Sequence, residues 1–221
     1  MKKRITTVIL SMVLVAAIIL ESTPVAYAAS GEYLDPTEPE TEEYEVPTYV
    51  TVTLNVPLEV QANDYYCGPA CVKAVVQCLT NTSSGQSVYA GLLGTSINGT
   101  YIGNIPAVIN NAIGSNHYAY CDISSASYST WIGYIKSSID SGYPVIMLIW
   151  PNSANTGGFS YTVKSGHFIV ISGYEYYTPT GTVSGLRIMD PHPVHNGVFW
   201  KYDLMALRSV NLQQTYHGIV K

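Results

Sequence analysis

The amino-acid sequence predicts an α+β fold, with helices in its first half and a mainly antiparallel β-sheet in its second. Three of the four stretches with helical character precede residue 114, whereas four of the seven strand-like stretches follow residue 166. Strand and helix patterns do not alternate strictly, as they do in a parallel α/β sheet. The order of the patterns therefore favours a helical half packed on an antiparallel sheet.

The helix with the clearest start signals begins at Cys67 and continues to about Leu79. Pro69 fits the first turn of a helix, where its missing N–H costs nothing, and the apolar residues Ala70, Val72, Ala74, Val75 and Val76 follow. Asn81–Gly85 contains the residues that end it. The other expected helices are Ser87–Leu93, Gly103–Ile113 with Pro106 in its first turn, and Ser127–Ser141, whose Trp131, Tyr134, Ile135 and Ile139 share one side.

The strands are expected from alternation or from short, continuous apolar runs. In the first expected strand, Pro47–Val60, threonines alternate with apolar residues, whereas Tyr143–Trp150 is apolar throughout, as in a buried strand. The remaining expected strands are His117–Ile123, His167–Tyr174, Leu186–Asp190, Val198–Tyr202 and Tyr216–Val220.

The N-terminus has the features of a secretory signal peptide. Lys2, Lys3 and Arg4 precede the sixteen-residue apolar run Ile5–Leu20, and residues 26–28 read Ala-Tyr-Ala. An uncleaved membrane anchor is the alternative, but sixteen helical residues span about 24 Å, less than the hydrocarbon core of about 30 Å. We therefore expect residues 1–28 to be removed, with cleavage after residue 28, and the protein to be secreted or held at the cell surface.

The charge of the remaining chain bears on its partners. The predicted leader holds three of the 10 basic residues and one of the 15 acidic ones, which leaves 7 basic and 14 acidic residues. Five of these acids lie in Glu38–Glu45, so residues 29–46 are expected to be an acidic flexible linker before a domain at residues 47–221. An acidic chain without Lys/Arg clusters argues against nucleic acid or an anionic membrane as partner. We expect the chain to be a monomer.

The segment Gln61–Cys71, which reads Q-A-N-D-Y-Y-C-G-P-A-C, contains a candidate nucleophile. Cys67 stands at the start of the predicted helix, where the positive end of the helix dipole favours thiolate over thiol. Gln61 could supply a side-chain N–H to a developing oxyanion, beside the backbone N–H of Cys67.

A cysteine nucleophile needs a base, and the base needs an orienting group. His167 opens a predicted buried strand, and Asp190 closes the next one. An antiparallel hairpin brings the start of its first strand beside the end of its second. Asp190 could then accept a hydrogen bond from His167.

Other interpretations of these residues remain open. Cys67 could be a small buried hydrophobe, His167 a structural residue, Asp190 a turn residue and Gln61 an ordinary surface residue. Cys71 is more compatible with packing than with a second nucleophile. If Cys67 is a free thiol, the other three cysteines (Cys71, Cys78 and Cys121) allow at most one disulfide.

The pairs Cys67-x₃-Cys71 and His192-x₂-His195 have a spacing that could bind a metal ion. The helical register of the cysteines opposes this interpretation, and we expect neither metal nor cofactor.

Three motifs together resemble those of papain-like cysteine peptidases. They are Q-x₅-C-G-P-A from Gln61, G-H-F-I-V-I-S-G-Y from Gly166, and M-D-P-H from Met189. The resemblance is closest to the bacteriocin-processing peptidases that remove double-glycine leaders, and to their secreted relatives. It implies a papain-like fold over most of the chain from Pro47, with Cys67 as nucleophile, His167 as general base and acid, Asp190 as orienting carboxylate and Gln61 as oxyanion donor.

The resemblance implies a peptide or protein substrate, whose peptide bonds are hydrolysed through a thioester acyl-enzyme. Leader-processing members are attached to a transporter and face the cytosol, whereas this chain has an export signal, so the double-glycine substrate is not carried over. Two other functions stay in competition. One is transglutaminase-like or amidase acyl transfer with the same residues, and the other is a secreted binding protein that keeps the fold without turnover.

Overall fold

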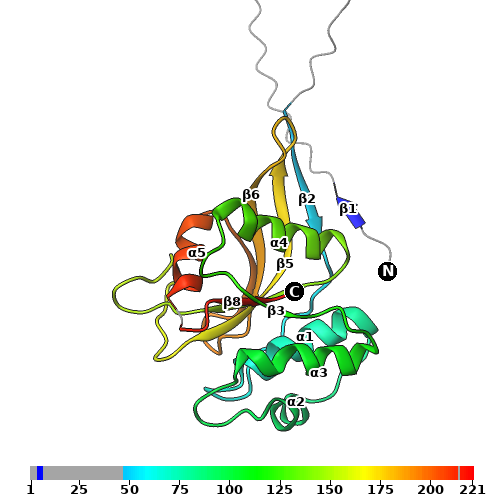
Figure 1. The fold of residues 1–221 in the computed structure, drawn as a ribbon, viewed down its shortest axis with the longest axis vertical. Helices are drawn as coiled ribbons and strands as arrows, with labels where there is room; N and C mark the ends of the chain where they lie inside the picture. The colour runs from blue at the N-terminus through cyan, green and yellow to red at the C-terminus, as the bar shows by residue number, and fades with distance from the viewer. Residues whose placement is uncertain (1–3, 7–46, 214) are drawn as a thin grey trace, which may run out of the picture.

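The computed structural model describes residues 4–6, 47–213 and 215–221. It confirms the α+β class, because a group of helices lies beside an antiparallel sheet (Figure 1). The helices are α1 (Cys67–Thr80), α2 (Gln86–Leu93), α3 (Ile105–Ile113), α4 (Tyr128–Asp140) and α5 (Leu204–Leu212), with a 3₁₀ turn, η1 (Ile102–Asn104), before α3. None of the helices in these ranges combines the length and apolar character needed to cross a membrane.

The strands form a single sheet in which every pairing is antiparallel. They are β1 (Arg4–Thr6), β2 (Tyr49–Thr53), β3 (Tyr120–Asp122), β4 (Val145–Ile149), β5 (His167–Tyr177), β6 (Thr182–Asp190), β7 (Gly197–Lys201) and β8 (Gly218–Val220). The long strand β5 is central to the sheet. On one edge its first half pairs with β4 and its second half with β2, while β6 pairs along the other edge.

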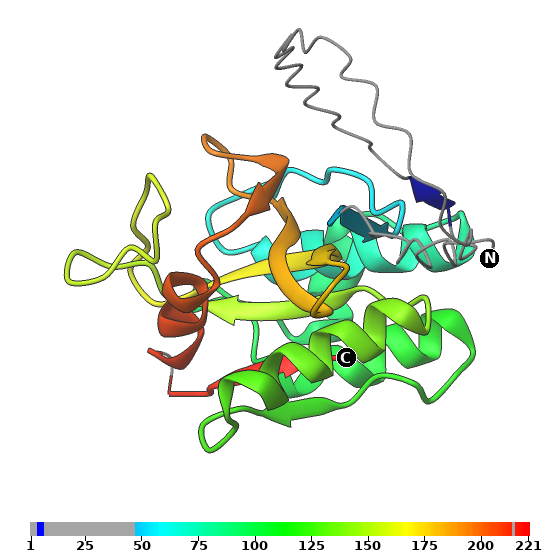
Figure 2. The same cartoon turned by 90° about the horizontal axis from the view of Figure 1, so that it is seen from above.

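The helices cover the sheet as two groups (Figure 2). In one group, helix α1 packs against β5 of the sheet, and α2 and α3 pack against α1. In the other group, α4 packs against β2, β4 and β5, and α5 packs against β4 and β6. Ten of the 14 residues of α1 are buried, so this helix lies inside the molecule. In α4 the predicted apolar side is buried through Trp131, Ile135 and Ile139, while Tyr134 is only partly covered. The N-terminus of α1 and the start of β5 are therefore held by one continuous core.

All four predicted helices are present, but several predicted ends were wrong. The first strand stops at Thr53 rather than Val60, because Val56 donates its N–H to the nearby Leu54 carbonyl and leaves the ladder. The predicted strands His117–Ile123 and Tyr216–Val220 are reduced to three residues each, in β3 and β8. Strands β5 and β6 are longer than predicted, since they continue into a projecting hairpin (Figure 1).

Helix α5 was not predicted. Its N-cap is Asp203, whose carboxylate accepts the N–H of Ala206 at 2.9 Å. An aspartate followed by apolar residues at Leu204, Leu207 and Val210 is a recognisable start signal that could have revealed it.

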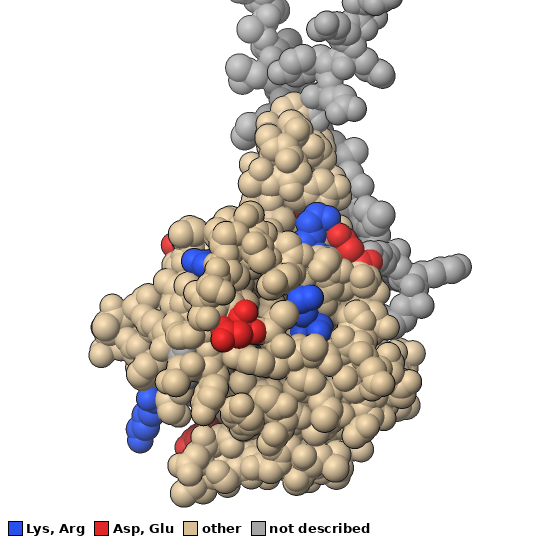
Figure 3. Space-filling view, in the orientation of Figure 1, with Lys and Arg blue, Asp and Glu red and all other residues tan. Residues whose placement is uncertain are grey.

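Two further predictions fall on the N-terminal part of the chain. The linker at residues 29–46 and the leader, apart from Arg4–Thr6, lie outside the described residues. Arg4–Thr6 form β1, which pairs with Thr51–Thr53 of β2. On the face drawn in Figure 3, charged side chains are few and scattered, with no cluster of Lys and Arg.

Candidate active site

Cys67 is the first residue of α1, and its side chain is 7% exposed. The backbone N–H groups of Phe168 and Gly68 hydrogen-bond to its sulfur. A Cβ on Gly68 would lie 2.5 Å from the Thr100 hydroxyl oxygen, so only glycine lets the loop that carries Thr100 close against the start of the helix. That loop is fixed by a 2.7 Å hydrogen bond between the hydroxyls of Thr95 and Thr100.

His167 is the first residue of β5, where it pairs with Ile149 of β4. Gly166, before it, has φ 139°, a conformation that favours glycine and turns the chain into the strand. The imidazole is 3% exposed and hydrogen-bonds to the Cys67 side chain. The start of β5 therefore lies directly beside the start of α1.

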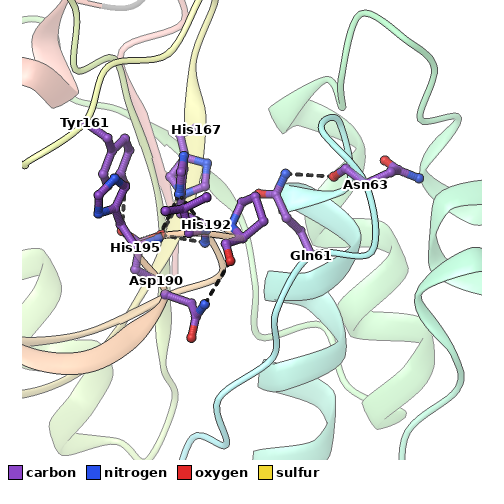
Figure 4. Close-up of polar contacts among 10 residues, drawn as sticks. Gln61, Asn63, Tyr161, His167, Asp190, His192 and His195 are labelled. Atoms are coloured by element: carbon purple, nitrogen blue, oxygen red, sulfur yellow. Dashed lines mark hydrogen bonds and ion pairs between the residues drawn. The ribbon is translucent and has the colours of Figure 1, made fainter.

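Asp190 is the last residue of β6 and has no exposed surface. Its Oδ1 lies 2.7 Å from His167 Nε2 and accepts the backbone N–H of His192 at 2.9 Å. Its Oδ2 accepts the hydroxyl of Tyr161 at 2.6 Å (Figure 4). The hairpin of β5 and β6 places the two strand ends as the sequence leads us to expect.

The electrostatics of this cluster favour a thiolate–imidazolium pair. Burial alone raises the pKa of Cys67, but the hydrogen bond and charge of His167, with two backbone N–H groups, bring that pKa below its ordinary value. Burial lowers the pKa of His167, but its bonds to Asp190 and Cys67 outweigh this and raise the pKa to about 9. Burial raises the pKa of Asp190, and His167, Tyr161 and His192 together bring it below the usual value. The thiolate of Cys67, the imidazolium of His167 and the carboxylate of Asp190 therefore stabilise one another.

Gln61 lies on the segment that precedes α1, and its backbone N–H donates to the Pro191 carbonyl at 2.9 Å. This bond ties the glutamine to the residue that follows Asp190. Its side chain is 7% exposed, and Nε2 donates one N–H to the Asn63 carbonyl at 2.7 Å (Figure 4). Its Oε1 is buried without a hydrogen-bond partner. One amide N–H of Gln61 is thus engaged locally, and Nε2 carries one further N–H.

The His192-x₂-His195 motif serves local structure. His192 Nδ1 accepts the backbone N–H groups of Val194 and His195 at 3.2 and 3.1 Å, which leaves that nitrogen no lone pair for a metal. Within the described residues, no three His, Cys, Asp or Glu side chains gather so as to hold a metal ion.

The remaining cysteines differ from Cys67. Cys71 is fully buried one helical turn further on, and burial, with the charges of Cys67 and Asp190, raises its pKa well above the ordinary value. Burial raises the pKa of Cys78 to about 11. All four cysteines, Cys121 included, are free thiols in the structure.

Sequence reasoning missed Tyr161 and the backbone N–H of His192 as partners of Asp190. Tyr161 lies in the irregular connection between β4 and β5, where no periodic pattern points to it. The N–H of His192 follows from the Asp-Pro-His turn, because an aspartate side chain often accepts the N–H two residues on. That signal was available in the sequence.

Comparisons with known proteins show the family to which the chain belongs. Residues 53–219 match the Peptidase_C39 like family, so the chain belongs to that family, as the resemblance to papain-like cysteine peptidases led us to expect. No curated protein sequence matches the chain.

The chain is also similar to solved structures, two of which are described here. One is the peptidase domain of Streptococcus ComA, a bi-functional ABC transporter involved in a quorum-sensing pathway, with 17% identity, 74% of this chain and 96% of that chain covered, and a TM-score of 0.44. The other is a double glycine motif protease from an AMS/PCAT transporter in complex with the leader peptide, with 14% identity, 76% and 91% covered, and a TM-score of 0.46.

Proposed function

We propose that this chain is an exported cysteine peptidase that hydrolyses peptide bonds with Cys67 as nucleophile. The observation that carries the proposal is the buried series Cys67–His167–Asp190, in which the thiol has a lowered pKa and the imidazole a raised one. A structural cysteine in an apolar site has its pKa raised, as Cys71 and Cys78 do. The family of the chain supports the same chemistry.

The reaction starts with attack of the Cys67 thiolate on the peptide carbonyl. The second amide N–H of Gln61 and the backbone N–H of Cys67 then stabilise the tetrahedral oxyanion, the latter because the first N–H groups of a helix have no partner within it. His167 gives its proton to the leaving amine as the C–N bond breaks, which leaves a thioester on Cys67. Water, deprotonated by His167, hydrolyses the thioester and restores the thiolate–imidazolium pair.

Asp190 holds His167 in the tautomer that this cycle needs. Because Nε2 bonds to Asp190, Nδ1 is the nitrogen that carries the exchanged proton. The carboxylate also stabilises the imidazolium while the thiolate is present.

Export is the second part of the proposal. The basic, apolar and small-residue segments of residues 1–28 support it, together with an acidic linker at residues 29–46 that separates the peptidase domain, residues 47–221, from the leader. Sequencing the N-terminus of protein collected from the medium or cell surface tests this, with Ala29 expected as the first residue. A chain that stays inside the cell with its N-terminus intact would contradict export but not the proposed peptidase chemistry.

The test of the chemistry is an activity-based probe with a thiol-reactive warhead and varied peptide arms, applied beside a peptide-cleavage assay. We expect labelling at Cys67 and loss of both labelling and cleavage in Cys67→Ala. Cys121→Ala is the matched control and should leave labelling and cleavage unchanged. Cys121 lies in the edge strand β3, which β4 and β8 separate from β5. Full cleavage by Cys67→Ala would refute the proposal.

A further inference from the structure

Tyr161 is held against Asp190 by a tethered loop. It lies in the connection between β4 and β5 but is only 9% exposed. The loop folds back on its own start, because the Val163 N–H donates to the Pro151 carbonyl at 2.8 Å and the Trp150 indole N–H donates to the Val163 carbonyl at 3.2 Å. These bonds fix Tyr161 from two residues away.

The two oxygens of Asp190 have different donors. Oδ1 accepts hydrogen bonds from His167 Nε2 and from the backbone N–H of His192, whereas Oδ2 accepts one from the Tyr161 hydroxyl at 2.6 Å. The carboxylate has no exposed surface, so water does not replace a lost donor. A buried ionised oxygen without a donor disfavours the charged form and frees the carboxylate to rotate.

The ring of Tyr161 also contacts the imidazoles around Asp190. It meets His167 edge to face, with centroids 5.7 Å apart, and stacks on His192 at 4.2 Å (Figure 4). Burial, followed by the charge of Asp190, raises the pKa of the Tyr161 phenol, so its hydroxyl keeps the proton that it donates. The hydroxyl orients the carboxylate, and the ring shields the bond between His167 and Asp190.

From this geometry we infer that Tyr161 is a positioning residue of the site, which keeps Asp190 ionised and in line with His167. The inference rests on the peptidase function proposed above. It adds Tyr161 as a fourth residue to the series Cys67–His167–Asp190. Tyr161 acts through Asp190 and His167 and contacts neither the sulfur nor the substrate in this role.

The experiment compares Tyr161→Phe with the unchanged enzyme. We expect kcat to fall about tenfold, as for loss of one hydrogen bond to a charged group, with KM within about twofold. The acid limb of the pH profile should move to higher pH by about half a unit or more, because Asp190 protonates earlier and a loosened His167 stabilises the thiolate less. The pH profile of Cys67 alkylation by iodoacetamide should move in the same direction, and it needs no peptide substrate.

Tyr118→Phe is the matched control. Tyr118 is also buried, and its hydroxyl donates to the Pro144 carbonyl at 2.8 Å, away from the site. It should lower thermal stability but leave both pH profiles in place. If Tyr161→Phe behaves like Tyr118→Phe, with both profiles unshifted, the positioning role is wrong.

A second variant covers the case in which Tyr161→Phe does not fold. Site-specific 3,5-difluorotyrosine at position 161 keeps the shape and makes the phenol a stronger donor, so it should move both profiles to lower pH. An unmoved profile overturns the inference here too. Absence of cleavage by the unchanged enzyme, or full cleavage by Cys67→Ala, overturns the proposed function instead, while the alkylation profile still tests Tyr161.

Discussion

The His167 imidazole and the Asp190 carboxylate lie 2.7 Å apart, with almost no exposed surface on either side chain. Such a pair is stable only when both charges have further partners. Here Cys67 faces the imidazole, and Tyr161 and the His192 N–H face the carboxylate. The protonation states of these groups are therefore coupled, and changing one shifts the others.

Replacing Asp190 with asparagine should reduce kcat/KM by about 100-fold or more, because an amide neither fixes the same His167 tautomer nor stabilises the imidazolium. Steady-state cleavage of a responsive peptide measures this. Asp140→Asn is a suitable control, since Asp140 forms an ion pair with Lys136 on α4, outside the site. An Asp190→Asn enzyme with unchanged kcat/KM would mean that His167 needs no orienting carboxylate.

Gln61→Ala should leave a measurable residual activity. Loss of one oxyanion donor costs on the order of 10²–10³ in rate, whereas the nucleophile and base remain. The decrease should appear in kcat more than in KM, because the oxyanion exists only in the transition state. Equal rates for Gln61→Ala and the unchanged enzyme would remove Gln61 from the mechanism.

Alkylation at acidic pH should separate Cys67 from an ordinary thiol. Because the Cys67 pKa is lowered chiefly by His167, iodoacetamide at about pH 6 should label Cys67 in the unchanged chain and not in His167→Ala. Mass spectrometry of the modified peptide gives the extent of labelling. Equal labelling in both proteins would show that the imidazole does not activate the sulfur.

The pH dependence of stability follows from His167, whose pKa is raised from 6.5 to about 9 on folding. A raised pKa means that the folded state holds the proton more tightly. The contribution to stability is therefore complete below about pH 6.5 and is lost as the pH rises through about 9. Urea unfolding at pH 6, 8 and 10 should show this loss, and His167→Ala should flatten it. Activity should decline over the same alkaline range, because the imidazolium that protonates the leaving amine disappears.

Gly68→Ala should destabilise the start of α1. The added Cβ would lie 2.5 Å from Thr100 Oγ1 and 2.8 Å from Thr100 Cβ, an overpacking that typically costs about 1–3 kcal/mol. Gly133→Ala in α4 is the control, because nothing lies within 4 Å of its Cβ position and alanine favours a helix by about 0.5–1 kcal/mol. Denaturant unfolding should therefore give opposite signs for the two variants. Loss of stability in both, or in neither, would contradict the close contact with Thr100.

The local parts of this molecule could be predicted from the sequence because short-range physics decides them. The start of α1 at Cys67 follows from Pro69 in the first turn, and the pairing of His167 with Asp190 follows from the ends of one hairpin. Predicted strands that depend on a distant partner were less accurate. Strand β2 ends at Thr53 because β4 pairs with the same edge of β5 from Ile171 back to His167, and nothing in residues 54–60 indicates where this distant strand begins to pair.

The sequence by itself determined the α+β class, the resemblance to papain-like cysteine peptidases and the four residues on which the proposed chemistry depends. Only the tertiary structure decided that the start of α1 meets the start of β5, that Gln61 uses one amide N–H on Asn63, and that Tyr161 reaches Asp190. The physical reason is the distance along the sequence between the residues that interact. Caps, turns and hairpins are fixed by neighbours a few residues away, whereas a buried charge acquires its partners only when distant segments share one core.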